Sequence, residues 1–213
     1  MENDERIDYE NLIIATGVRR RRLGVPGETD FQGRGILESG TRDKDTVKGK
    51  DVVIVGGGDA AAENAVILSQ VAKTVTLVHR RNELSARPEF RHEIDRRDNI
   101  QILFDTQVRR FVGDSDVTGV EVIESGRGEG LLPADAVLVR IGVQPNSELF
   151  RGTLEMDSHG YVLIDPSCAT SASGVFAIGD VASPLAPTLS TAVGMGATAA
   201  KAVFRCHVAK PRI

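Results

Sequence analysis

A short glycine-rich segment has the residue types and the spacing to hold a phosphate-bearing cofactor. The segment, which we call the glycine turn, consists of Gly56, Gly57, Gly58, Asp59, Ala60 and Ala61. It fits the pattern G-x-G-x-x-A, in which Gly56 allows a sharp turn, Gly58 lets the backbone approach a pyrophosphate and Ala61 lets a helix pack close to a strand. Phosphate groups are then expected at the N-terminus of the following helix, where free N–H groups and the helix dipole favour negative charge.

A second group of residues, His79, Arg80 and Arg81, indicates which cofactor the turn would hold. These residues follow a strand expected at 74–78, where an acidic side chain would accept hydrogen bonds from an adenosine ribose and repel a 2′-phosphate. Guanidinium groups instead match phosphate oxygens in a planar and often bidentate way. The sequence therefore predicts NADP(H) rather than NAD(H). The alternative is a strand–turn–helix that holds no nucleotide and has a solvated basic edge.

The elements that would position these residues follow from the hydrophobic pattern. Apolar β-branched runs at 52–55 and 74–78 predict buried strands, with a helix at 63–72 between them. A further helix is expected to begin near Pro88, since proline is tolerated in the first helical turn. The pattern then predicts, in order, a strand at 100–104, an antiparallel meander at 108–112, 117–123 and 131–139, and a return to the parallel sheet at 135–142. This order predicts an α/β fold with a Rossmann-like three-layer domain and an antiparallel β-meander.

Composition excludes several other classes of function. The net charge of −4 gives no basic field for nucleic acid, and no apolar segment is long enough to span a membrane. The acidic N-terminus is unlike a signal peptide, so we expect a cytoplasmic protein. The histidines and the cysteines Cys168 and Cys206 have no metal-ligand spacing, and no disulfide is expected. The basic run 19–22 is interpreted as a solvated loop.

The segments on either side of the predicted domain also contain recognisable sequences. The segment YENLIIATGVRRRRLGVPGE at 9–28 resembles the crossover segment of two-dinucleotide flavoprotein reductases, and GVFAIGDV at 174–181 is similar to their second flavin motif. The glycine turn with VHRR, and IGVQPNSELF at 141–150, resemble the NADPH site and a further segment of the low-molecular-weight thioredoxin reductases in particular. Strands are expected at 9–15, 162–165 and 174–180, and a last helix at 190–208.

The resemblance implies FAD as a second cofactor. Ala15, Thr16 and Gly17 would lie beside the flavin adenine dinucleotide, and Gly179 and Asp180 would belong to the motif whose aspartate hydrogen-bonds the ribityl chain. Glu63 would face the nicotinamide, although an exposed helix-surface residue is an equally good interpretation. The predicted cofactor-binding residues are therefore Gly56, Gly57, Gly58, Asp59, Ala60, Ala61, Glu63, His79, Arg80, Arg81, Arg87, Gly142, Ala15, Thr16, Gly17, Gly179 and Asp180. No catalytic or metal-binding residue is predicted.

Four departures from the family pattern limit what the resemblance implies. The sequence shows no N-terminal Rossmann unit with its own G-x-G-x-x-G for the FAD pyrophosphate, so only a partial FAD site is expected. The stretch 39–42, Ser-Gly-Thr-Arg, replaces the redox C-x-x-C, and thiolate exchange needs a sulfur nucleophile. Ser85 stands where the family has a third arginine, for which Arg87 is a possible substitute. Pro187 and Thr188 replace a polar Arg-Gln pair at the start of the last helix.

These observations lead to a division of the chain and to three hypotheses. Residues 1–35 and 143–213 are expected to be parts of an FAD-type domain, and 36–142 the NADPH-binding domain. The chain would be the NADPH-binding portion of a flavin-dependent oxidoreductase without a dithiol, transferring hydride from NADPH to FAD, with a separate chain supplying the N-terminal FAD half. The alternatives are a non-catalytic NADP-binding module and a truncated remnant of a reductase. A homo- or hetero-oligomer is expected because the absent half would leave apolar surface exposed. Asp59 is expected to cap its helix.

Overall fold

The computed structural model describes residues 7–208 of the 213-residue chain, and side chains as far as residue 205. The chain divides into two compact units. Unit 1 is formed by the described parts of 1–19 and 143–213, and unit 2 by residues 20–142. The expected boundary at residue 35 therefore lies elsewhere, because Phe31 is buried in unit 2 against the strands and meander of that unit.

Unit 2 is built around a parallel sheet of five strands in the order β3-β10-β4-β5-β6. Val52 pairs with Ala136 on one side and with Val75 on the other, so β4 lies between β10 and β5. The strands are β3 (Ile36–Leu37), β4 (Asp51–Val55), β5 (Thr74–Val78), β6 (Ile100–Leu103) and β10 (Ala136–Val139). Because β4 and β5 are central and covered on both faces, their sequences are almost continuously apolar rather than alternating. The expected α/β fold is confirmed.

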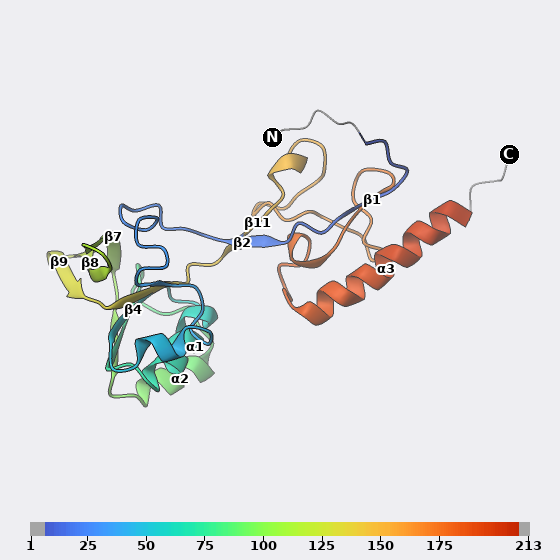
Figure 1. The fold of residues 1–213 in the computed structure, drawn as a ribbon. Coiled ribbons are helices and arrows are strands. Elements are labelled where there is room, and N and C mark those ends of the chain that lie inside the picture. Colours follow the sequence, from blue (N-terminus) through green and yellow to red (C-terminus); the bar gives the residue numbers. More distant parts are fainter. Residues whose placement is uncertain (1–6, 209–213) are drawn as a thin grey trace. The chain divides into compact units, whose positions relative to one another are not determined.

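Two helices cover one face of this sheet, and a three-stranded meander covers the other (Figure 1). The helices are α1 (Asp59–Ser69) and α2 (Pro88–Asp95), with Pro88 at the first helical position as expected. Helix α1 packs closely through the fully buried Ala61 and Ala65. The meander consists of β7 (Thr106–Gly113), β8 (Val117–Glu124) and β9 (Gly128–Pro133), paired antiparallel in that order.

Several details of unit 2 differ from expectation, among them the third meander strand, which was expected at 131–139 and runs over Gly128–Pro133. Helix α1 begins at Asp59, directly after the glycines, and not at residue 63. The segment 36–50, which has no clear hydrophobic period, contains β3 and the short 3-10 helix η1 (Lys44–Val47). Strand β3 is only two residues long and lies at the edge of the sheet, so its pairing depends on a distant partner, β10, rather than on a local pattern.

Unit 1 contains a parallel pair of strands and a long helix. Strand β1 (Leu12–Ile14) pairs with β12 (Val175–Ala177), and α3 (Leu189–Val208) follows the 3-10 helix η3 (Gly179–Val181). A short sheet of β2 (Val18–Arg20) and β11 (Val143–Pro145) lies where the chain passes from one unit to the other, and η2 (Glu148–Phe150) follows it. The expected strand at 162–165 is reduced to an isolated bridge between Met156 and Val162.

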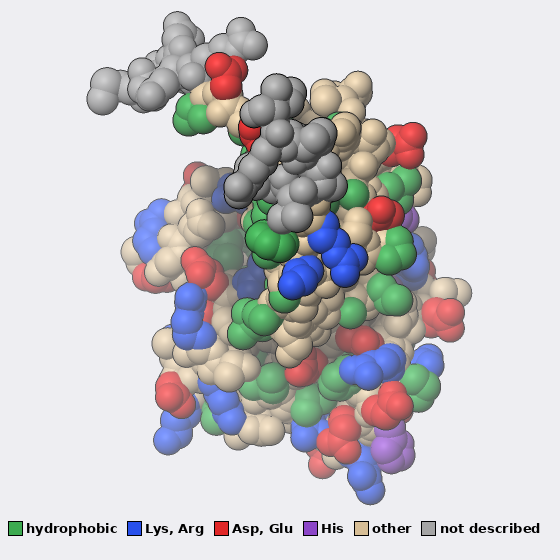
Figure 2. Space-filling model, turned by 90° about the vertical axis from the view of Figure 1, so that its right-hand side faces the viewer, with side chains coloured by type: hydrophobic (Ala, Val, Ile, Leu, Met, Phe, Trp, Pro, Cys, Tyr) green, Lys and Arg blue, Asp and Glu red, His purple; other side chains and the backbone are tan. Residues whose placement is uncertain are grey.

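Thr188, which with Pro187 replaces the family's Arg-Gln pair, has a structural role at the start of α3. The hydroxyl oxygen of Thr188 accepts a hydrogen bond from the Thr191 N–H at 3.1 Å, so Thr188 caps the helix. Helix α3 also carries exposed apolar side chains, among them Leu189, Val193 and Phe204. Near the described end of α3, hydrophobic side chains lie beside Lys and Arg side chains (Figure 2). No helix in the described range 7–208 has the length and apolar character that spanning a membrane requires.

Candidate functional site

The glycine turn is fixed at its first position by the sheet. Gly56 donates its N–H to Val78 O at 3.0 Å and has φ +148, a backbone conformation that residues with a side chain rarely adopt. A Cβ atom at this position would overlap the carbonyl oxygen of Arg140, the residue that follows the neighbouring strand β10. Glycine is therefore required at position 56 by the protein's own packing.

The second glycine is required by a histidine. A Cβ atom on Gly57 would overlap the imidazole ring of His79, which is 8% exposed and follows strand β5. The Nε2 atom of His79 is buried and has no hydrogen-bond partner among the described residues. His79, predicted as a cofactor-binding residue, thus lies beneath the glycine turn and supports it.

The third glycine has no such packing constraint. Gly58 has φ −92 and ψ −177, which any residue adopts, and a Cβ atom placed on it would have Ser85 Oγ as its nearest neighbour, at 3.8 Å. Its carbonyl accepts the N–H groups of Ala61 and Ala62. Within residues 7–208, the N–H groups of Gly58, Asp59 and Ala60 have no hydrogen-bond partner. The start of α1 therefore offers three free donors next to open space.

The loop after β5 folds back over the glycine turn. The Ala86 N–H and the Ser85 hydroxyl both donate to Gly57 O, at 3.0 and 3.2 Å. The Arg87 N–H and Nε donate to the two carboxylate oxygens of Asp59, at 2.7 and 2.8 Å. The expectation that Asp59 caps α1 is wrong, since Asp59 is the first helical residue and its carboxylate is bound to Arg87. Arg87, considered as a third phosphate ligand, is held at the turn by this pair.

The two arginines that were predicted to select NADP(H) remain free. Arg80 and Arg81 are exposed, and neither forms an ion pair with a carboxylate among residues 7–208. They follow β5, which lies beside the strand that leads into the glycine turn. Their guanidinium groups are thus available to an anion at this edge of the sheet. Glu63 is exposed on α1, and Gly142, with φ +94, accepts the Arg21 N–H at 3.0 Å.

His79 gives unit 2 a predicted pH dependence. Burial lowers the pKa of His79 below its usual value of about 6.5, with a smaller contribution from the nearby Arg80 and Arg81. The unfolded chain therefore takes up a proton at this residue before the folded chain does. We expect the free energy of unfolding to fall as the pH drops below about 6.5, and to stop falling on this account once the pH is below the lowered pKa.

Urea unfolding of the wild type and of His79→Gln between pH 5 and 8 measures this effect. The variant should lose part of the slope with pH, whereas His92→Gln, on the exposed face of α2, should retain it. An identical slope in the wild type and in His79→Gln would contradict the assignment.

The residues predicted to lie near FAD gather in unit 1. A hollow of about 400 Å³ is lined in part by Ala15, Gly17, Gly179 and Asp180, together with Pro187 and Thr188. Gly17 and Gly179 have φ +66 and +69, and a Cβ atom placed on Gly17 would meet no heavy atom within 4 Å. Thr16 is not among the lining residues, since its side chain donates to Asn146 O at 2.7 Å. The residues present fit part of a dinucleotide, because small residues and one carboxylate face a common hollow.

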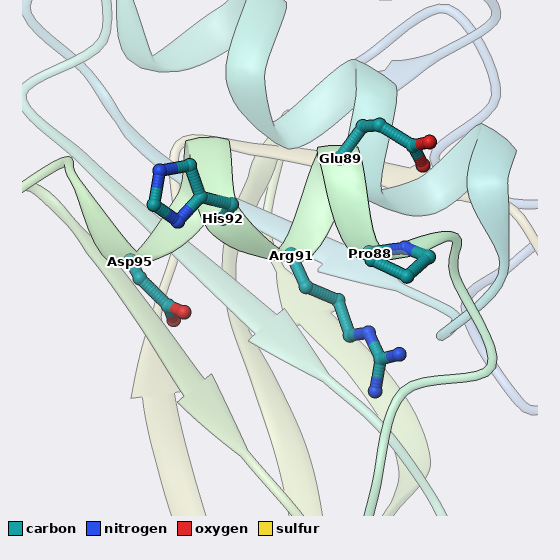
Figure 3. A pocket seen from close by; sticks show the side chains of 5 residues that line it. All are labelled: Pro88, Glu89, Arg91, His92 and Asp95. Carbon is teal, nitrogen blue, oxygen red and sulfur yellow. The ribbon is translucent and has the colours of Figure 1, made fainter.

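A larger hollow, of about 620 Å³, lies along α2 and has a different character. Its lining residues all come from one helix, and in Figure 3 Glu89 points to one side while Arg91 and Asp95 point to the other. Side chains that diverge from a single exposed helix do not enclose a ligand. Size alone therefore does not mark the functional site in this protein. Among the described residues, no group of His, Cys, Asp and Glu side chains could hold a metal ion.

The stretch that replaces the redox cysteines forms an ordinary turn. The carboxylate of Asp43 accepts the N–H groups of Glu38 and Ser39 at 2.7 and 2.9 Å, and Arg42 forms ion pairs with Glu38 and Asp43. The Gly40 N–H donates to Asn64 Oδ1 on α1 at 2.9 Å. Charged and amide groups thus hold the turn where a dithiol would be expected.

Comparison with known proteins identifies the family. The model of the pyridine nucleotide-disulphide oxidoreductase family matches residues 1–196. The chain belongs to this family. It is 37% identical over 191 residues to thioredoxin reductase of Streptomyces coelicolor and 38% identical over 191 residues to a 34.2 kDa protein of the rubredoxin operon of Clostridium pasteurianum. Each alignment covers 89% of this chain.

Solved structures agree with the sequence comparison. Thioredoxin reductase of T. acidophilum superposes with a TM-score of 0.82 at 33% identity over 97% of this chain, and that of Lactococcus lactis with a TM-score of 0.82 at 27% identity over 95%. The chain thus has the Rossmann-type fold of the thioredoxin reductase-like members of the pyridine nucleotide-disulphide oxidoreductase family. It spans 59% of the length of the S. coelicolor relative and 62% of the C. pasteurianum relative, and 69% and 67% of the T. acidophilum and L. lactis chains.

Within this family member, two features of the site escaped the sequence-based prediction. The pairing of Asp59 with Arg87 joins residues 28 positions apart, and no local pattern indicates it. Arg140 lies against the glycine turn, and it is the one charged residue in the apolar stretch 136–141. A charge at the carboxyl end of a buried strand was a usable signal for this contact.

Proposed function

We propose that unit 2 binds NADP(H) across the carboxyl edge of its parallel sheet and serves a flavin-dependent oxidoreductase. The observation that carries this proposal is Gly58. Nothing within the described protein requires glycine at this position, while three free N–H groups lie at the start of α1. A pyrophosphate placed there would explain both features, because it needs close backbone approach and hydrogen-bond donors.

Each element of the site would then have a distinct task. The donors of Gly58, Asp59 and Ala60 would hold the pyrophosphate, with Gly56 and Gly57 shaping the turn and Ala61 keeping α1 close to the sheet. Arg80 and Arg81 would bind the 2′-phosphate. The Asp59–Arg87 pair would keep the loop after β5 in place over the turn, and Glu63 and Gly142 would lie on the nicotinamide side.

The hollow of unit 1 supports a second part of the proposal, which concerns FAD. Gly17, Gly179 and Asp180 would hold part of this cofactor, and NADPH would supply the hydride that FAD accepts. The reaction would not continue to an internal dithiol, since the stretch 39–42 contains no sulfur. A cytoplasmic location is part of this proposal.

A further strand-and-helix segment would complete the FAD site and cover unit 1. Strand β1 has β12 as its one strand neighbour among the described residues, and α3 exposes Leu189, Val193 and Phe204. We include in the proposal that such a segment, on this or on a separate chain, pairs with β1 and covers these side chains, giving a homo- or hetero-oligomer where it is separate.

Calorimetric titration of the purified chain tests the nucleotide part of the proposal. NADPH should bind at least about 30-fold more tightly than NADH, since two charge-assisted contacts depend on the 2′-phosphate. Equal affinities for the two nucleotides would contradict the assignment. Co-expression with the N-terminal portion of the S. coelicolor relative tests the flavin part, with bound yellow flavin and NADPH oxidation as the expected result. A colourless complex that binds NADPH without oxidising it would contradict the flavin part and support the alternative, a non-catalytic NADP-binding module.

A further inference from the structure

Two arginines of unit 2 share one acceptor. Arg140 Nη2 donates to the backbone carbonyl oxygen of Glu38 at 2.6 Å, and Arg20 Nη1 donates to the same oxygen. Arg140 also donates through Nη1 to Val139 O at 2.8 Å. The two guanidinium groups therefore lie close together and are fixed by the backbone rather than by acidic side chains.

The positive charge of this pair is offset only in part, by the Asp43 carboxylate, which is itself paired with Arg42. Within residues 7–208, neither Arg20 nor Arg140 forms an ion pair. The two acids nearby, Glu38 and Asp43, have carboxylates that bind Arg42 at 2.7 and 3.1 Å. Partial burial, together with the charge of Arg20, lowers the pKa of Arg140 to about 10. Two adjacent cations held in this way lack the anion that guanidinium pairs usually bind.

The pair lies beside the glycine turn on the side away from Arg80 and Arg81. The Arg140 N–H donates to Val55 O at 2.7 Å. The carbonyl oxygen of Arg140 lies where a Cβ atom on residue 56 would be, so it packs directly against Gly56. Since β10 and β5 flank β4 on opposite sides, basic residues stand at both sides of the turn.

We propose that Arg20 and Arg140 form an oxyanion site that binds a phosphate or carboxylate group at the β10 side of the glycine turn. The location of this site relative to a dinucleotide rests on the proposed function. A nucleotide whose adenosine lies at β5 would extend its other half toward β10, which brings the nicotinamide-side phosphate near the pair. The oxyanion of a separate electron acceptor has the same chemistry.

Titration with inorganic pyrophosphate tests the site without relying on NADP(H). We expect Arg140→Gln and Arg20→Gln each to bind pyrophosphate about tenfold more weakly than the wild type, because each removes a charge-assisted donor. Arg22→Gln is the matched control, since Arg22 belongs to the same basic run and is exposed. Wild-type affinity in both the Arg140 and Arg20 variants, or an equal loss in Arg22→Gln, would overturn the proposal. Arg140→Lys keeps the charge and should recover part of the affinity, which guards against a folding defect in Arg140→Gln.

Two further titrations are needed. One decides whether the oxyanion belongs to the nucleotide or to a separate ligand, and the other tests the proposed function independently of the oxyanion site. If saturating NADP⁺ abolishes the difference in pyrophosphate binding between the wild type and Arg140→Gln, the group is a phosphate of the nucleotide, whereas a difference that persists identifies a separate ligand. Titration with 2′,5′-ADP reports on the adenosine side of the proposed nucleotide site, which includes Arg80 and Arg81 but not Arg20 or Arg140. If 2′,5′-ADP fails to bind, the proposed function fails, while the pyrophosphate result still decides whether Arg20 and Arg140 form a site.

Discussion

The double substitution Arg80→Gln with Arg81→Gln is expected to weaken NADPH binding by about 30- to 1,000-fold and to change NADH binding by less than about threefold. Both side chains are exposed and free of carboxylate partners in the described structure, so their removal should not disturb the fold. The physical reason is that the 2′-phosphate, which NADH lacks, would lose two guanidinium contacts. Equilibrium titration by nucleotide fluorescence measures both affinities.

The control for this prediction is Arg91→Gln, which removes one positive charge from the exposed face of α2. It should leave the preference for NADPH unchanged if the contact is local. A similar loss for NADPH in Arg91→Gln would indicate general attraction of the nucleotide to a basic surface. In that case salt should also abolish the preference, since exposed charges are screened over about 8 Å at physiological ionic strength.

Substitutions in the glycine turn are expected to separate folding from binding. Gly56→Ala should lower the free energy of unfolding by about 2–4 kcal/mol, because it places a methyl group against the carbonyl of Arg140 and strains a positive φ. Gly58→Ala should change that free energy by less than about 1 kcal/mol, since its backbone conformation is ordinary and the nearest atom is 3.8 Å away.

The same pair of variants distinguishes a glycine required for packing, Gly56, from a glycine required for cofactor binding, Gly58. Gly58→Ala should fold normally and still bind NADPH at least about tenfold more weakly, because the methyl group would occupy the space that the pyrophosphate needs. Chemical denaturation and NADPH titration of the two variants provide the comparison. Wild-type affinity in a folded Gly58→Ala protein would remove the observation on which the proposed function depends.

The predicted elements of unit 2 were largely confirmed, since local pattern suffices for them. The strand at 74–78 agrees with β5, and the helix beginning at Pro88 agrees with α2, because a buried apolar run and a proline at the first helical position are strong local signals. The short strand β3 was not predicted. Its pairing with β10 is set by residues about 100 positions away, which no sequence window contains.

The site shows the same division between local and distant determinants. The sequence predicts a nucleotide site from the glycine turn and the basic residues after the second strand, and in the structure His79, Arg80 and Arg81 follow β5, with His79 packed against the glycine turn. The role of Asp59 was misjudged, because a carboxylate directly after glycine is typical of a helix cap and its actual partner, Arg87, is reached only when the loop after β5 folds back. The basic run 19–22 was interpreted as a solvated loop, yet Arg19 pairs with Glu148 and Arg20 binds Glu38 O.

By itself, the sequence determined the α/β class, the family resemblance and the glycine turn, because these depend on hydrophobic period and on residue type at fixed short spacings. The tertiary structure alone decided why each glycine is present. Gly56 and Gly57 are required by contacts with Arg140 and His79, at the ends of strands that only folding brings together, whereas Gly58 faces open space. It also placed Arg140 next to Arg20, two like charges separated by about 120 positions in the chain, and so revealed a basic pair that sequence spacing cannot show.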